Sequence, residues 1–143
     1  MRWIMKVAAL VAVLPLVASA CSKSSTPANA GGDAGSSAVA ISEGEFSLSS
    51  TPATDASGPV TFSVTNDGKM EHEFVVLRTD VAPDALPVES GKASEDGHID
   101  ELEGIQPGTS QTLTVDLPAG TYVLVCNLVG HYQSGMHAGF TVT

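Results

Sequence analysis

The sequence has little cysteine and few basic residues. Cys21 and Cys126 are its only cysteines, and six lysines and arginines stand against sixteen aspartates and glutamates. Without Arg2 and Lys6 near the start, four basic residues remain, so the rest of the chain carries a charge near −12. A surface this acidic is a poor partner for nucleic acid, because the phosphates repel it.

Long apolar runs are also lacking. The run VAALVAVLPLV at 7–17 has 11 residues, which is too short to span a bilayer as a permanent helix. It follows Arg2 and Lys6 and precedes the small residues ASA at 18–20, which is the pattern of a bacterial export signal. We therefore predict that residues 1–20 are a signal peptide and that the protein is exported to the cell envelope.

The residues around Cys21 resemble the lipobox of bacterial lipoproteins, in which small residues directly precede a cysteine. The resemblance implies that Cys21 becomes the mature N-terminus, carries a lipid and anchors the protein at the periplasmic or extracytoplasmic face of a membrane. Ala18 departs from the pattern, since the family prefers leucine there, and ordinary cleavage after Ala20 is the alternative. Residues 21–38 are mostly small and polar, so we expect a flexible linker.

The remaining residues, 39–143, are enough for one small folded core. Short stretches alternate apolar and polar side chains, and Val60, Phe62 and Val64 would share one face of a strand. Turn sequences such as NDG at 66–68 separate these stretches. We predict an all-β domain, a sandwich or a barrel, with strands at 39–49, 59–67, 72–80, 110–117, 121–126 and 138–143.

The segment 81–109 has a different pattern. It lacks strand alternation, and it holds seven acidic residues between Asp84 and Glu103 with Lys92 as its one lysine. We expect a long connection with one short helical piece. Its acidic residues form either a solvated loop, which we favour, or a docking face for a basic partner.

Cys126 has no disulfide partner within the domain, because Cys21 lies at the predicted processing site. An unpaired thiol in an exported protein is buried and inert, bridges to another chain or binds a metal. His131 and Met136 follow Cys126 on one short loop between two predicted strands. Thiolate, imidazole and thioether form a soft ligand set that suits copper, whereas methionine is a poor zinc ligand.

A trigonal blue-copper site needs a second histidine. His72 is the best candidate, because it opens an apolar strand whose rigid backbone would hold the ring against the loop. We expect His98 to be solvated within the acidic segment. His137 directly follows Met136, so the two side chains should not reach the same metal, and we expect His137 to be exposed nearby. Met70 precedes the strand and is interpreted as a turn or packing residue.

These residues resemble the cupredoxins, the small blue (type 1) copper proteins, over about 105 residues. The motif is Cys126, four residues, His131, four residues, Met136 and a final strand, with an earlier histidine before an apolar strand. The resemblance implies a Greek-key β-sandwich or barrel and one type 1 copper ion. It also implies His72, Cys126 and His131 as equatorial ligands and Met136 as the axial ligand. Glu73 departs from the pattern, because many members have asparagine there.

The resemblance further implies a monomer that carries single electrons between redox protein partners and is not an enzyme. In the family, the C-terminal histidine reaches the surface through an apolar patch, which here would be His131 with Val129, Gly130 and Tyr132. Copper oxidases and nitrite reductases need additional histidine clusters, and no His-x-His pair occurs. The alternatives are a periplasmic or surface carrier that delivers copper to an oxidase, and a metal-free interaction domain.

Overall fold

The structure is a computed structural model that describes residues 38–143. The predicted signal peptide, the predicted lipidation at Cys21 and nearly all of the predicted linker lie outside the described residues. Within residues 38–143, no helix is long and apolar enough to cross a membrane.

The described part of the chain forms eleven strands and one short 3-10 helix, η1. The elements in chain order are β1 (Val39–Gly44), β2 (Ser47–Thr51), β3 (Thr54–Asp55), β4 (Gly58–Asn66), β5 (His72–Arg78), β6 (Val88–Glu89), β7 (Lys92–Ala93), β8 (His98–Ile105), β9 (Ser110–Leu117), β10 (Gly120–Val125), η1 (Tyr132–Ser134) and β11 (His137–Val142). The predicted all-β domain is therefore confirmed.

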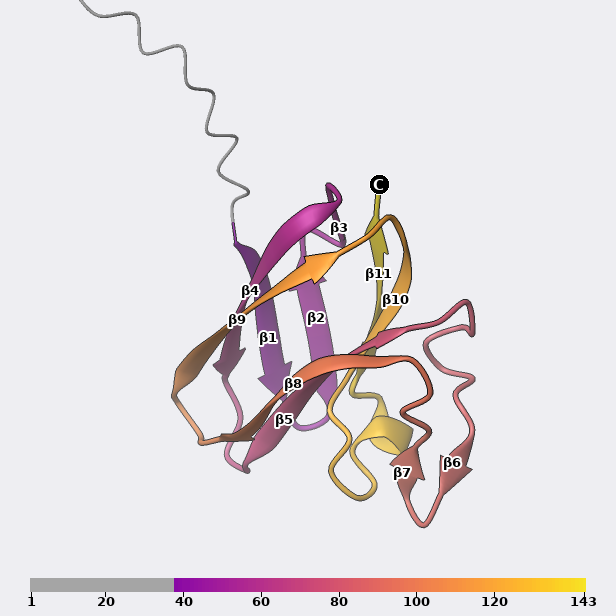
Figure 1. The fold of residues 1–143 in the computed structure, drawn as a ribbon. Helices are drawn as coiled ribbons and strands as arrows, with labels where there is room; N and C mark the ends of the chain where they lie inside the picture. The colour runs from indigo at the N-terminus through magenta and orange to yellow at the C-terminus, as the bar shows by residue number, and fades with distance from the viewer. Residues whose placement is uncertain (1–37) are drawn as a thin grey trace, which may run out of the picture. The chain divides into compact units, whose positions relative to one another are not determined.

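Two sheets face each other as a β-sandwich, and they do not close into a barrel (Figure 1). One sheet has the order β2-β1-β4-β9, and the other has the order β3-β11-β10-β5-β8. Alternate residues of β4, namely Val60, Phe62 and Val64, are fully buried between the sheets, as their period-two pattern predicts. Phe62 lies at the centre of the core, with its ring 5.3 Å from those of both Phe74 and Phe140.

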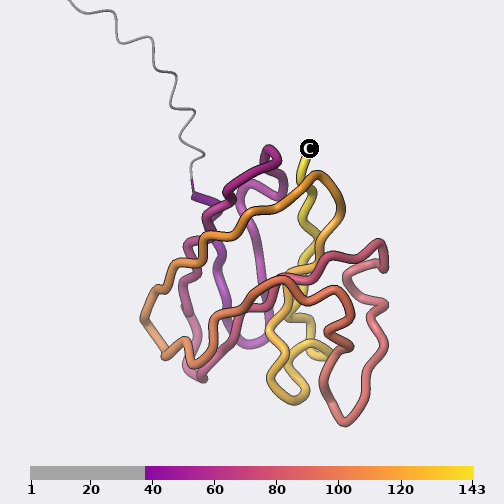
Figure 2. The backbone as a smooth tube through the Cα atoms, in the orientation of Figure 1, coloured from indigo at the N-terminus to yellow at the C-terminus, as the bar shows by residue number. Residues whose placement is uncertain are grey.

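A second, smaller apolar cluster covers the outer face of the five-stranded sheet. Val75 and Leu77 of β5 pack there with Tyr132 of η1 and with Leu86 and Ala93 from the long connection. β5 is buried on both faces, and this explains its continuous apolar run at 74–77. The β6–β7 hairpin is held against the β10–β11 loop, where the N–H of Gly130 donates to the carbonyl of Gly91 at 2.8 Å (Figure 2).

The prediction for residues 81–109 was wrong. This segment contains the β6–β7 hairpin and the eight-residue strand β8, and no helical piece. β8 is an edge strand of its sheet and exposes residues on both faces, so it shows no apolar alternation. Residues 39–49 also differ from the prediction, because the turn at 45–46 divides them between β1 and β2.

Candidate metal centre

Four predicted ligand residues meet at one end of the sandwich. His72 is the first residue of β5, and Cys126 directly follows the neighbouring strand β10. His131 precedes η1, and Met136 precedes β11. Two adjacent strands of one sheet therefore hold His72 and Cys126, while the connection from β10 to β11 supplies the other two residues.

The side chains of His72, Cys126 and His131 converge on one point. His72 Nδ1 lies 3.2 Å from His131 Nδ1 and 3.7 Å from Cys126 Sγ, and Sγ lies 3.4 Å from His131 Nδ1. His72 and Cys126 are fully buried, and His131 is 6% exposed. Among the described residues, this is the one cluster of three or more His, Cys, Asp or Glu side chains whose potential ligand atoms are close enough to share a metal.

Backbone hydrogen bonds close the loop from Cys126 to Met136. The N–H of Cys126 donates to the carbonyl of Met136 at 3.1 Å, and the N–H of Met136 donates to the carbonyl of His131 at 3.2 Å. Gly135 has φ 116°, which other residues rarely adopt, and it lets the chain turn back after η1. Met136 is fully buried in the same core cluster as Cys126, beside the three converging side chains.

The Cys126 sulfur accepts a hydrogen bond from the backbone N–H of Glu73 at 3.4 Å. Burial raises the pKa of the Cys126 thiol to about 12, although the N–H groups of Glu73 and Leu128 act in the opposite direction. The metal-free site therefore holds a protonated thiol at neutral pH. A metal that binds there displaces the proton, since the thiolate is the ligand.

The surroundings of His131 favour its neutral imidazole, which is the form that binds a metal. Burial lowers the pKa of His131, and the neighbouring His72 ring lowers it further. His72 Nε2 lies 3.5 Å from Glu45 Oε1. The N–H groups of Lys69 and Met70 both donate to that oxygen and hold the pKa of Glu45 below its usual value.

This set of donors fits copper. Two imidazole nitrogens and one sulfur converge in the buried interior, and a thioether residue is packed beside them. Such ligands favour copper over the hard cations magnesium, calcium and manganese, which prefer oxygen. The three converging side chains and Met136 are thus positioned as a type 1 copper site.

The remaining histidines lie outside the cluster. His98 begins β8, is exposed as predicted and lies 3.6 Å from a carboxylate oxygen of Glu101. His137 is half-buried, where exposure was predicted, and its ring packs 5.1 Å from that of Tyr132. Met70 is a turn residue, as predicted, with 48% of its surface exposed.

The sequence analysis missed Asn127, which follows Cys126 and is almost fully buried. Its Oδ1 accepts from the N–H of Ala93, and its Nδ2 donates to the carbonyl of Ala93 and to Glu95 Oε1. Asn127 therefore ties the strand end that carries Cys126 to the β6–β7 hairpin. Its position directly after Cys126 is the sequence signal that points to it.

Two carboxyl groups are buried close to the site. Glu43 of β1 is fully buried, and neither of its oxygens has a hydrogen-bond partner within residues 38–143. Burial raises its pKa to about 8, and the charge of Glu73 adds to this shift. Glu73 is 8% exposed, and its pKa is also raised, mainly by burial, while Lys92 acts in the opposite direction.

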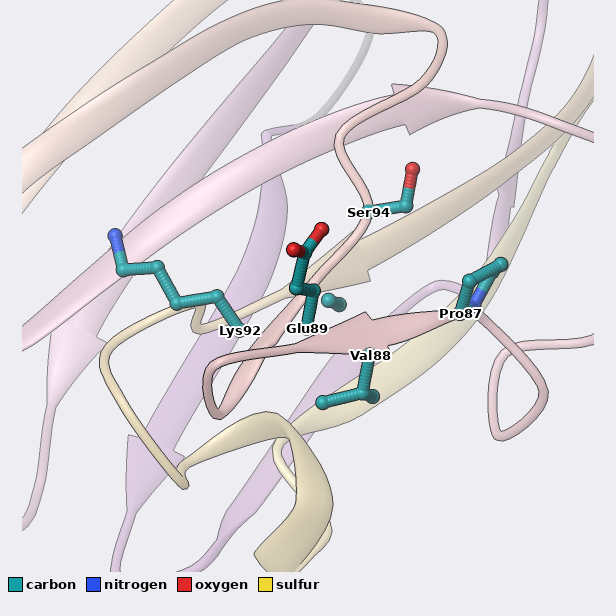
Figure 3. Close-up of a pocket in the computed structure, with 6 residues that line it drawn as sticks. Pro87, Val88, Glu89, Lys92 and Ser94 are labelled. Carbon is teal, nitrogen blue, oxygen red and sulfur yellow. The ribbon is translucent and has the colours of Figure 1, made fainter.

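An open surface pocket of about 520 Å³ lies on the β6–β7 hairpin and not at the converging side chains. Figure 3 shows its lining on and around the hairpin, namely Pro87, Val88, Glu89, Lys92, Ala93 and Ser94. The pocket is therefore separate from the candidate metal centre.

The sequence matches the model of the sulfocyanin (SoxE) domain over residues 41–143. The chain belongs to the sulfocyanin domain family. Sulfocyanins are cupredoxins, and cupredoxins are blue copper proteins that carry electrons through one type 1 copper ion. No curated protein sequence matched the chain.

Solved structures of blue copper proteins share the fold of this sulfocyanin-family domain. Auracyanin from Roseiflexus castenholzii is 25% identical with a TM-score of 0.56, over 73% of this chain and 94% of that chain. Auracyanin A, a blue copper protein from Chloroflexus aurantiacus, is 21% identical with a TM-score of 0.56, over 75% and 98%. Rusticyanin from Thiobacillus ferrooxidans is 21% identical with a TM-score of 0.53, over 73% and 76%.

Proposed function

We propose that this protein is an exported, membrane-tethered carrier of single electrons. His72, Cys126, His131 and Met136 would hold its copper ion. The observation that carries this assignment is the convergence of two Nδ1 atoms and one Sγ atom of buried side chains from β5 and the β10–β11 loop.

Bound copper supplies a one-electron couple between its +1 and +2 states. The chain keeps the ligands in one geometry for both states, because adjacent strands hold His72 and Cys126 and backbone bonds close the loop. Burial excludes water from the ligand atoms, and the N–H of Glu73 donates to the Cys126 sulfur. Such hydrogen bonds and the axial ligand tune the reduction potential.

The expected route for electrons to the surface runs through the edge of His131, with Val129, Gly130 and Tyr132 beside it. His131 is 6% exposed and Tyr132 is 4% exposed, so neither forms an open edge. Phe46 stacks edge-on against the His131 ring and is 44% exposed, while Val129 is 69% exposed. We define the copper-end patch as Phe46, Met70 and Val129, three exposed apolar side chains on the loops around the site. The redox partner docks on this patch.

The predicted lipid at Cys21 would keep the domain near membrane-bound redox partners, with residues 21–38 as the tether. A Cys21→Ser variant tests this proposal. It should move from the membrane fraction to the soluble extracytoplasmic fraction. Retention in the membrane fraction would contradict lipid anchoring and leave the copper assignment untouched.

The test of the copper site is an optical spectrum of the protein with copper(II), recorded beside a Cys126→Ser variant. An intense visible band from the thiolate–copper bond should appear in the wild type and disappear in the variant. A colourless protein that still binds copper(I) would favour copper carriage instead of electron transfer. A protein that binds no copper would overturn the ligand assignment.

A further inference from the structure

The turn between β1 and β2 contacts both histidines of the proposed copper site. Glu45 Oε1 lies 3.5 Å from Nε2 of His72, and the ring of the next residue, Phe46, packs against His131. This turn is distant in sequence from the ligands, and no sequence pattern around EGEF at 43–46 predicts that it contacts the histidines.

His72 needs an acceptor for its remaining ring proton. The ring is fully buried, its Nδ1 faces Cys126 and His131, and its Nε2 has no hydrogen-bond partner among the described residues. When Nδ1 binds a metal, the ring proton must be on Nε2. A buried N–H without an acceptor is destabilising, because it has lost its hydrogen bond to water. Glu45 Oε1, at 3.5 Å from Nε2, is the carboxylate oxygen placed to accept a hydrogen bond from this N–H.

The backbone holds Glu45 in place. The N–H groups of Lys69 and Met70 both donate to Oε1, each at 2.7 Å. The side chain lies over Gly68, where an added Cβ would be 2.8 Å from the Glu45 Cδ atom. The turn before β5 therefore fixes the carboxylate next to the histidine that begins β5, and Gly68 leaves the space it needs.

We propose that Glu45 is a positioning residue of the copper site: its carboxylate accepts the Nε2–H of His72 and so presents Nδ1 to the metal. The proposal rests on the proposed copper site. A carboxylate bonded to a ligating histidine orients the ring and makes it a stronger base. Its negative charge also favours copper(II) over copper(I), because it compensates the additional positive charge.

The test compares Glu45→Gln with Glu71→Gln. Glu71 is a matched control, because its carboxylate is close in sequence to His72 but binds Gln106. In the diamagnetic copper(I) protein, ¹H–¹⁵N spectra should show His72 protonated at Nε2, with that resonance moved by Glu45→Gln and not by Glu71→Gln. The ratio of copper(II) to copper(I) affinity should fall about tenfold in Glu45→Gln, which raises the potential by about 59 mV.

A Gly68→Ala variant provides a second test that keeps the charge. The added methyl group should displace Glu45 and shift the His72 Nε2–H resonance in the same direction as Glu45→Gln. If Glu45→Gln and Glu71→Gln leave this resonance equally unchanged and give equal affinity ratios, the inference is wrong while the copper site stands. A wild-type protein without the visible copper band would overturn both the proposed function and this inference.

Discussion

The ring of Phe46 stands edge-on to the ring of His131, with the ring centres 5.2 Å apart and the planes at 76°. Phe46 thereby covers a proposed ligand while exposing much of its own surface. A partner or a chelator that approaches this end of the sandwich meets Phe46 before it meets the imidazole.

Removal of the ring should open the site. We expect Phe46→Ala to lose copper to a chelator several-fold faster than the wild type, because water and chelator then reach His131. The loss of absorbance at the visible copper band measures the rate. Met70→Ala is the control, since Met70 also belongs to the copper-end patch but has no ring to stack on His131. Equal rates in the two variants would contradict a covering role for Phe46.

A charge placed on the copper-end patch should affect docking and not the metal. Val129 is 69% exposed, so Val129→Glu should leave the copper spectrum intact. The carboxylate should slow electron exchange with a partner, because it must be desolvated when an apolar surface docks. Stopped-flow oxidation by a protein partner measures the rate. Loss of the spectrum would instead mean that Val129 supports the site itself.

Copper affinity should increase with pH. Because burial raises the pKa of the Cys126 thiol to about 12, the metal-free protein holds the proton throughout the neutral range, and copper must displace it. The displacement of one proton predicts about a tenfold gain in apparent affinity per pH unit. Competition titrations between pH 7 and 9 measure the slope. A flat profile would show that the thiol is already ionised in the metal-free site.

Glu43 should make the metal-free protein less stable as the pH rises. In the folded protein its pKa is about 8, well above the usual 4.5, so unfolding between these values releases a proton. The free energy of unfolding therefore falls as the pH rises from about 4.5 to 8, is unaffected by Glu43 below this range and levels off above it.

Glu43→Gln should remove this slope. One pKa unit corresponds to about 1.4 kcal/mol, so the variant should gain a few kcal/mol over the wild type between pH 5 and 8. Urea unfolding of the metal-free proteins at several pH values measures the difference. Glu89→Gln on the exposed hairpin is the control and should follow the wild type. Parallel profiles for wild type and Glu43→Gln would show that Glu43 is not protonated in the fold.

The alternation of apolar and polar side chains along the sequence was enough to predict the strands that face the core. The strand β9 has the predicted bounds, 110–117, because Leu113 and Leu117 point inward at period-two spacing. The strand β8 was missed because its pairing with β5 depends on partners distant in sequence and not on an apolar face of its own. Edge strands of this kind carry little periodic signal.

The ligand residues could be predicted because they lie at strand ends and on one short loop. Cys126, His131 and Met136 fall within eleven residues of sequence, and His72 opens an apolar run. Glu45 and Phe46 could not be found in this way. They reach the histidines only because β1 pairs with β4, which brings the β1–β2 turn beside the turn before β5.

The strand β8 is one of the two edge strands of the five-stranded sheet, and an unpaired edge can pair with a strand from another molecule. Asp100 and Glu103 are exposed along it, with Glu101 between them. If two copies met edge to edge, these carboxylates would be brought together and would repel each other. The same exposed carboxylates that leave β8 without an apolar pattern therefore disfavour edge-to-edge aggregation of this protein at high concentration.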